Sequence, residues 1–217
     1  LFLIISGLIG LFLTNNHYND VFDIIKTLIT KSNTKVWKKI SYAEREIEKI
    51  TTAHYKGDKE NLNKYANNKD LPNSWRLAIK QLEAKISEED VIMLLNRNSF
   101  VFEQNTTQKV KVLRNLSALA PSLGMFGTVL GLIKLLNDLS DYSSIGSNMS
   151  LALITTLYGI FFANMIINPL ISRLENYQFS VLKSYEQVHF WLTIIKEKKP
   201  SFYLKQNPNS ANKEKKK

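Results

Sequence analysis

Three threonines stand near the middle of two apolar segments of this 217-residue chain: Thr128 in the first segment, and Thr155 and Thr156 in the second. A helical threonine can satisfy its hydroxyl within its own helix, by donating to a backbone carbonyl one turn earlier. Alternatively, hydroxyls that face each other across two helices could line a hydrated path for an ion. The three threonines are therefore candidate ion-path residues, with simple helix packing as the alternative.

Glycines and prolines surround these threonines. Gly127 and Gly131 have the small-xxx-small spacing that lets two helix backbones approach closely. Pro121 and Pro169 stand near opposite ends of the two segments, where each either acts as a hinge or ends a helix, because proline removes a backbone hydrogen bond. The candidate packing and hinge residues are Pro121, Gly124, Gly127, Gly131, Gly159 and Pro169.

Neither apolar segment contains an Asp, Glu or His that could relay a proton. Ionisable groups inside a membrane usually mark proton pathways, because a charge there is costly and is kept for a use. If these segments conduct protons, the carboxylate must come from a partner chain.

The two segments have the length and composition of membrane spans. Residues 116–136 carry one charge and residues 149–171 carry none, and about 20 apolar residues cross the hydrocarbon core as a helix. Residues 1–13 form a third apolar block that is too short to span alone. This block shows no signal-peptide features and begins at Leu. It is therefore predicted to be the end of a transmembrane helix in a truncated sequence, with an exported protein as the alternative.

The charge distribution predicts the orientation of these spans. The net charge is +10, with 17 Lys+Arg against 13 Asp+Glu in residues 15–113 and 10 against 4 in residues 172–217. The connection over residues 137–148 has two Asp and no Lys or Arg. Basic regions remain in the cytoplasm, so the connection is expected to face outside. Topology then explains much of the basic excess, and we expect membrane lipid rather than nucleic acid as a partner.

The remaining segments have helical periodicity. Apolar residues recur with the 3.6-residue period over residues 20–30, 34–53 and 74–86. Ser87-Glu-Glu-Asp90 is a capping box that begins a helix running on into the first span, and a long amphipathic helix follows Pro169. The predicted fold class is all-α: a polytopic helical membrane protein with a transmembrane hairpin and a helical cytoplasmic domain.

The predicted boundaries follow from these patterns. Residues 1–14 end a transmembrane helix, 15–112 form the cytoplasmic helical domain, 113–137 and 149–171 are transmembrane helices, 138–148 form the periplasmic loop, 172–204 form a cytoplasmic helix, and 205–217 form a disordered basic tail.

Enzyme and metal motifs are absent from the sequence. There is no cysteine, no nucleotide-binding or hydrolase signature, and no zinc-binding H-E-x-x-H. The three histidines are far apart along the chain. We expect neither an enzyme nor a bound cofactor or metal.

The two spans resemble a known family. "APSLGMFGTVLGLIKLL", a connection with "SSIGSNM", and "SLALITTLYGIFFANMIINPL" are similar to the last two transmembrane helices of the MotA/TolQ/ExbB proton-channel family, over residues 113–175. Ala-Pro, G-x-x-G-T-V-x-G and A-L-x-T-T-x-x-G recur in the same order and spacing. "SSIGSNM" and "ALITTLYG" are more similar to the flagellar MotA branch than to the energy-transducing ExbB and TolQ branch.

The resemblance implies an assembly in the bacterial inner membrane. It implies a homo-oligomeric ring, pentameric in the family, around MotB- or ExbD-like single-span partners that each carry a proton-accepting Asp. The transported ion would be H⁺, with Na⁺ as the alternative, and Thr128 and Thr156 match family hydroxyls on the path. The expected function is that of a channel-forming subunit of a motor driven by the proton motive force. An ExbB/TolQ-type motor and a non-conducting scaffold are the alternatives.

A weaker resemblance concerns contact with a flagellar rotor. "AEREIE", residues 43–48, is similar to the acidic end of the cytoplasmic helix that faces the rotor in MotA proteins. The candidate rotor contacts are Lys35, Lys38, Glu44 and Glu48. Val36 stands where the family usually has Arg, and the neighbouring lysines supply charge without the planar fork of a guanidinium.

Overall fold

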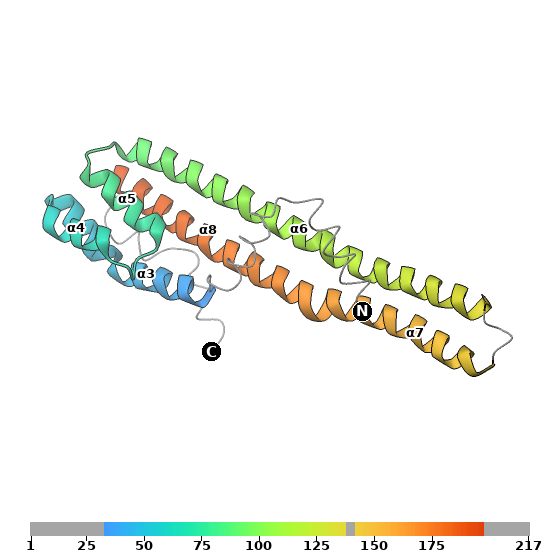
Figure 1. Cartoon of the computed structure of the whole chain (residues 1–217). Helices are drawn as coiled ribbons and strands as arrows, with labels where there is room; N and C mark the ends of the chain where they lie inside the picture. The colour runs from blue at the N-terminus through green and yellow to red at the C-terminus, as the bar shows by residue number, and fades with distance from the viewer. Residues whose placement is uncertain (1–32, 138–141, 198–217) are drawn as a thin grey trace. The chain divides into compact units, whose positions relative to one another are not determined.

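The computed structural model describes residues 33–137 and 142–197. Their regular elements, labelled as in Figure 1, are all helical: α3 (Asn33–Lys56), α4 (Lys59–Asn67), α5 (Asn73–Glu83), α6 (Glu88–Asn137), α7 (Tyr142–Phe161), the π-helix η1 (Phe162–Ile167) and α8 (Asn168–Lys196). The all-α prediction is confirmed. The predictions for residues 1–14, for a helix over 20–30 and for the tail 205–217 lie outside the described residues.

The chain divides into two compact units. Within the described residues, the first unit comprises residues 105–137 and 142–176, and the second comprises residues 33–104 and 177–197. Two long helices, α6 and α8, contribute to both units.

The second unit is a bundle in which α3, α4 and α5 gather around the start of α6 and the end of α8 (Figure 1). The helices predicted over residues 34–53 and 74–86 are observed as α3 and α5. The core contains Trp75 and Trp191, both fully buried, with ring centroids 5.0 Å apart. The Trp191 indole N–H donates to Thr51 Oγ1 at 2.9 Å, so the polar atom of this buried ring has a partner.

The predicted capping box begins α6. The Asp90 backbone N–H donates to Ser87 Oγ at 3.2 Å, and the Ser87 hydroxyl donates to Asp90 Oδ2 at 2.7 Å. The cap therefore satisfies one of the backbone donors that a helix N-terminus leaves unpaired. From there α6 continues to Asn137 as one helix, as the sequence predicts.

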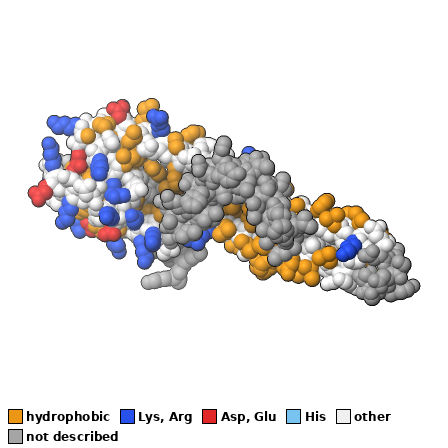
Figure 2. Space-filling view, in the orientation of Figure 1, with side chains coloured by type: hydrophobic (Ala, Val, Ile, Leu, Met, Phe, Trp, Pro, Cys, Tyr) orange, Lys and Arg blue, Asp and Glu red, His pale blue; other side chains and the backbone are white. Residues whose placement is uncertain are grey.

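The first unit is a hairpin of α6 against α7, η1 and the start of α8, which run side by side in Figure 1. Both arms are long and apolar enough to cross a membrane. Within the most apolar 18-residue stretch of each arm, only 17% and 22%, respectively, is buried inside the chain. Figure 2 shows apolar side chains gathered along the hairpin. α7 already begins at Tyr142, inside the segment predicted as a loop. Asn148 is only 4% exposed, so this early part of the helix already packs within the unit.

His54 gives the bundle a predicted sensitivity to acid. Burial lowers the pKa of this half-buried imidazole, and the nearby Glu88 carboxylate opposes the shift. The folded state disfavours the imidazolium. The contribution of neutral His54 to the free energy of unfolding is therefore fully present above the unfolded pKa of about 6.5, and it is lost as the pH falls from there through the lower folded pKa. We expect His54→Gln to lose less thermal stability than the wild type between about pH 7 and pH 5. Thermal denaturation of the full chain in detergent measures this, with pH 8 as the reference. Equal acid sensitivity of both proteins would contradict the role of His54.

Candidate ion-path site

A seam of small residues on α6 faces the second arm of the hairpin. Its members alternate in spacing of three and four residues, which keeps them on one side of a helix. They are Ser117, Ala120, Gly124, Gly127 and Gly131. Small side chains along such a seam let two backbones approach closely.

The closest approach is at Gly159 of α7. A Cβ atom at this position would lie 2.6 Å from the Ala120 carbonyl oxygen and 3.1 Å from the Gly124 Cα. Both of these atoms are backbone atoms and cannot rotate away. Only glycine fits between the helices at this level without moving them apart.

The contact continues toward the connection between the helices. A Cβ at Gly127 would lie 2.7 Å from the Thr155 Cβ, and a Cβ at Gly131 would lie 2.7 Å from the Ala152 Cβ. The four glycines that the sequence singles out for packing therefore all lie at the contact between the two arms, with no room for a larger side chain.

Two of the three candidate threonines bond within their own helices. The Thr128 hydroxyl donates to the Met125 carbonyl at 2.5 Å, and the Thr155 hydroxyl donates to the Ala152 carbonyl at 2.8 Å. These bonds satisfy the hydroxyls without any ligand. Packing alone therefore accounts for the hydroxyls of Thr128 and Thr155 in this structure.

Thr156 differs from the other two. Its hydroxyl donates across the hairpin to the Gly124 carbonyl at 3.3 Å, longer than the usual O–H···O bond of about 2.5–3.0 Å and therefore weak. The side chain is half-buried. A long cross-helix bond is readily exchanged for a bond to water or a hydrated ion, so Thr156 is the strongest of the three candidates for lining a path.

Both prolines lie within continuous helix, so the interpretation of these residues as helix ends is wrong. Pro121 is inside α6. Pro169 is the second residue of α8, which follows η1 without a break. Just before this proline, the Asn168 N–H donates to the Ala163 carbonyl, five residues back instead of four. Because proline has no N–H and its ring clashes with the preceding turn, a widened turn at this point accommodates it.

The π-helix changes which residues of the second arm face α6. In a regular α-helix, residues seven and fourteen positions after Gly159 would also face the α6 seam. These residues are Ile166 and Arg173, but Ile166 is 41% exposed and Arg173 is also exposed. Ile167 and Leu174 are buried instead. The extra residue in the π-helical turn therefore shifts by one position the residues of the second arm that face α6. This shift keeps the Arg173 guanidinium out of an apolar contact.

Polar side chains meet at the end of the hairpin opposite its connection, here called the inner end. The Ser117 hydroxyl donates to Asn168 Oδ1 at 2.7 Å, and Asn168 Nδ2 donates to Asn164 Oδ1 at 3.1 Å. Further along the helices, Arg114 pairs with Glu175 at 2.5 Å. The sequence analysis missed the asparagines and the π-helix; two asparagines beside a proline in a charge-free segment were the available signal.

The candidate rotor contacts lie on α3 in the other unit. Lys35, Lys38 and Glu48 are exposed. Glu44 is exposed as well, but its Oε1 accepts a hydrogen bond from Gln187 Nε2 at 2.8 Å. Glu44 is therefore held to α8, whereas the two lysines present their charges to solvent.

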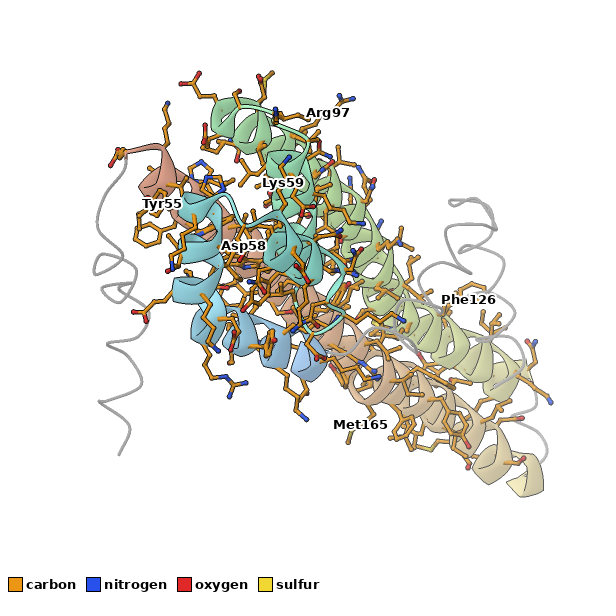
Figure 3. The ribbon with its side chains drawn as sticks, turned by 90° about the vertical axis from the view of Figure 1, so that its left-hand side faces the viewer. Tyr55, Asp58, Lys59, Arg97, Phe126 and Met165 are labelled. Atoms are coloured by element: carbon orange, nitrogen blue, oxygen red, sulfur yellow. The ribbon has the colours of Figure 1, made fainter. Side chains whose placement is uncertain are left out.

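The outer faces of the hairpin are apolar. Phe126 is 59% exposed and Met165 is 68% exposed, and both project outward in Figure 3. Residues 115–133 and 142–172 contain no charged residue and no His. The arrangement can therefore solvate an ion with oxygen atoms, but it cannot bind a proton on an ionisable side chain of its own.

Comparison with known proteins places these features in a family. The sequence profile of the MotA/TolQ/ExbB proton channel family matches residues 66–187. The chain is 36% identical over 88 residues to the uncharacterized protein YtxD of Bacillus subtilis (strain 168), covering 41% of this chain and 32% of YtxD. It is 47% identical over 79 residues to motility protein A of Treponema pallidum (strain Nichols), covering 36% of this chain and 30% of that protein.

The fold is also similar to a solved structure. The flagellar MotAB stator complex from Bacillus subtilis contains a chain that superposes with a TM-score of 0.78 at 17% identity, over 99% of this chain and 86% of that one. The sequence matches, in contrast, span about a third of the length of the two curated relatives.

Proposed function

Because the chain belongs to the MotA/TolQ/ExbB proton channel family, we propose that it is a channel-forming subunit of an ion-driven membrane motor of the flagellar stator type. The observation that carries the proposal is the Thr156 hydroxyl, which bridges to the Gly124 carbonyl across a glycine-packed contact between two charge-free stretches, residues 115–133 and 142–172. The similarity to motility protein A of Treponema pallidum favours the flagellar type.

The hairpin would cross the bacterial inner membrane as two spans. Its outward apolar side chains are suited to lipid or to neighbouring copies of the chain, since polar groups are expensive in the hydrocarbon region. The basic residues on either side of the hairpin and the acidic connection orient it with the connection outside. Several copies would form a ring, because a single hairpin exposes most of its apolar surface.

A partner chain would supply the proton-binding group. Since residues 115–133 and 142–172 of the hairpin contain no carboxylate, we assign this role to an Asp on a single-span partner inside the ring. Removal of that Asp from water raises its pKa, so that it can load a proton from the outside and release it to the cytoplasm. As the Asp gains and loses its proton, its change of charge would alter its interaction with the Thr156 hydroxyl. This repeated change would bias a rotation of the ring around the partner helix.

The bundle formed by α3, α4 and α5 would transmit the motion. Lys35 and Lys38 are our first candidates for contact with a rotor, because their side chains are exposed on the same helix. Glu48 is a further candidate. Glu44 is the weakest of the four, since it would have to give up its hydrogen bond to Gln187.

The proposal predicts a strong effect at Thr156. Thr156→Val has nearly the same shape but no hydroxyl, so we expect ion flux to fall by about tenfold, which corresponds to the loss of one hydrogen bond of about 1.4 kcal/mol. Thr156→Ser retains the hydroxyl and should recover most of the flux. The measurement is proton influx into liposomes containing the full-length chain and its cognate single-span partner, followed with an internal pH-sensitive dye.

Controls separate the outcomes. Ser122→Ala removes an exposed hydroxyl of α6 that bonds within its own helix at 3.2 Å, and it should conduct like the wild type. Unchanged flux in Thr156→Val would remove Thr156 from the path. A wild-type complex that conducts neither H⁺ nor Na⁺ would overturn the channel function and favour a packing scaffold. Conduction without support of motility in a complementation assay would favour an ExbB/TolQ-type motor.

A further inference from the structure

The polar group at the inner end of the hairpin is more than a single hydrogen bond. The Ser117 hydroxyl donates to Asn168 Oδ1 at 2.7 Å, and Asn168 in turn donates from Nδ2 to Asn164 Oδ1 at 3.1 Å. Both asparagines are exposed on the hairpin surface. The hydrogen bonds within the group leave the Asn164 Nδ2 amide without an acceptor among the described residues, and an unpaired polar group is costly in hydrocarbon. This side of the hairpin must therefore face water, a partner helix or an ion.

The two prolines add backbone oxygens at the same place. In a helix, the N–H of residue 121 would bond to the Ser117 carbonyl, but Pro121 has no N–H. On the other arm, the Asn168 N–H donates to the Ala163 carbonyl, so the next acceptor in this pattern is the Asn164 carbonyl. Pro169 cannot donate to it. Each of the two linked helices therefore carries, beside its polar side chain, a carbonyl that has lost its helical donor.

The π-helix brings this group into line with Thr156. In an uninterrupted α-helix Asn168 would point about 120° away from Thr156, since each residue turns the helix by about 100°. A turn closed by an i→i−5 bond takes up one extra residue, which reduces the difference to about 20°. The contacts agree: Thr156 bonds to Gly124 and Asn168 bonds to Ser117, two turns apart on the same seam of α6.

We propose that Asn168, with Ser117, Asn164 and the carbonyls freed by the two prolines, forms a binding station for a hydrated monovalent cation at the inner end of the ion path. This inference rests on the proposed function and extends the path beyond Thr156. The station is the last group of ligands that an ion meets before the cytoplasm.

The chemistry of the group suits such an ion. Its side-chain and backbone oxygens can replace waters around Na⁺, or accept hydrogen bonds from a hydronium ion. It contains no carboxylate, so the ion keeps part of its hydration and leaves readily, as conduction requires. The nearby Arg114 guanidinium is paired with the Glu175 carboxylate at 2.5 Å, and this pairing reduces its repulsion of a cation.

Replacement of Asn168 tests the station. The full-length chain and its cognate single-span partner are reconstituted in liposomes under an imposed membrane potential. H⁺ entry is followed with a pH dye in sodium-free buffer, and Na⁺ entry with a sodium dye at constant pH. We expect Asn168→Leu to lower the flux of the conducted ion by about tenfold. Asn176→Leu, the same change at an exposed site further along α8, should leave the flux unchanged.

A second variant separates ion contact from packing. Asn168→Asp preserves the size of the side chain but adds a titratable group with an ordinary pKa of about 3.9. If an ion passes this position, the flux of the variant gains a further dependence on internal pH, beyond the one that the wild type has, because the ionised carboxylate retains the cation more strongly than the amide does. A packing role predicts no such dependence. The variant also provides the test if Asn168→Leu fails to assemble.

The outcomes are distinct. If Asn168→Leu conducts like the wild type, or if Asn168→Asp retains the wild-type pH dependence, the station is refuted while the proposed function stands. If Thr156→Val still lowers the flux in the same preparation, Thr156 stays on the path and only the role of the inner end is withdrawn. If the wild-type complex itself conducts neither ion, the proposed function fails and the station fails with it.

Discussion

Gly159→Leu is expected to separate the two arms of the hairpin and to abolish assembly of a functional complex. A Cβ at this position would lie 2.6 Å from the Ala120 carbonyl oxygen and 3.1 Å from the Gly124 Cα. These are backbone atoms of a continuous helix, so the strain can be relieved only by moving α6 away from α7. Overpacking of this kind costs about 3 kcal/mol or more, which corresponds to a fall in melting temperature of about 6–12 °C.

Gly146→Leu is the matched control for this experiment. Gly146 lies in the same helix, and a Cβ added there meets no atom of the described residues within 4 Å. Leucine is a better helix former than glycine by about 1 kcal/mol. We therefore expect this variant to be as stable as the wild type or slightly more stable. The measurement is the melting temperature and oligomer yield in detergent. Equal losses at both positions would show that the close contact at Gly159 is not what holds the hairpin.

Trp191→Ala is expected to unfold the bundle of the second unit. Trp191 is fully buried, its ring centroid lies 5.0 Å from that of Trp75, and its N–H donates to Thr51 Oγ1 at 2.9 Å. Removing the ring leaves a large cavity in the core and takes the indole donor from Thr51 Oγ1, whose hydroxyl still donates to the Ile47 carbonyl at 2.6 Å. Truncation of a buried tryptophan costs about 3–5 kcal/mol, a large fraction of the stability of an ordinary domain.

Two variants resolve the origin of that loss. Thr51→Val retains the packing but leaves the indole N–H without its acceptor, and should cost about 1–3 kcal/mol. Trp37→Ala removes a tryptophan that is 37% exposed, and should cost much less than Trp191→Ala. Denaturant unfolding of the full chain in detergent, followed by near-ultraviolet circular dichroism, measures each free energy. A loss at Trp37 as large as that at Trp191 would contradict the assignment of the core.

Much of the helical architecture followed from local patterns. The 3.6-residue period gave α3 and α5, because one buried face with residues such as Ile40 and Ile50 is sufficient to define an amphipathic helix. The capping box at Ser87 identified the start of α6, because a cap depends only on residues within the first turn. Such features need no information from distant parts of the chain.

The roles of the individual threonines could not be predicted in this way. Thr128, Thr155 and Thr156 are chemically alike in the sequence, and only the position of the opposite helix separates them. Two bond within their own helices, and one reaches the Gly124 carbonyl. Which partner a hydroxyl finds depends on the rotation and spacing of the two helices, which are set by packing along the whole seam.

The sequence by itself determined the two apolar segments, most of the helical elements, the absence of Asp, Glu and His from both segments and the glycines that allow close approach, because composition and periodicity carry this information. Only the tertiary structure decided that Pro169 follows a π-helix and does not end a helix. It also decided that Asn168 reaches Ser117 on the opposite arm. The physical reason is that one extra residue in a turn rotates all later side chains, and only packing against α6 selects that rotation.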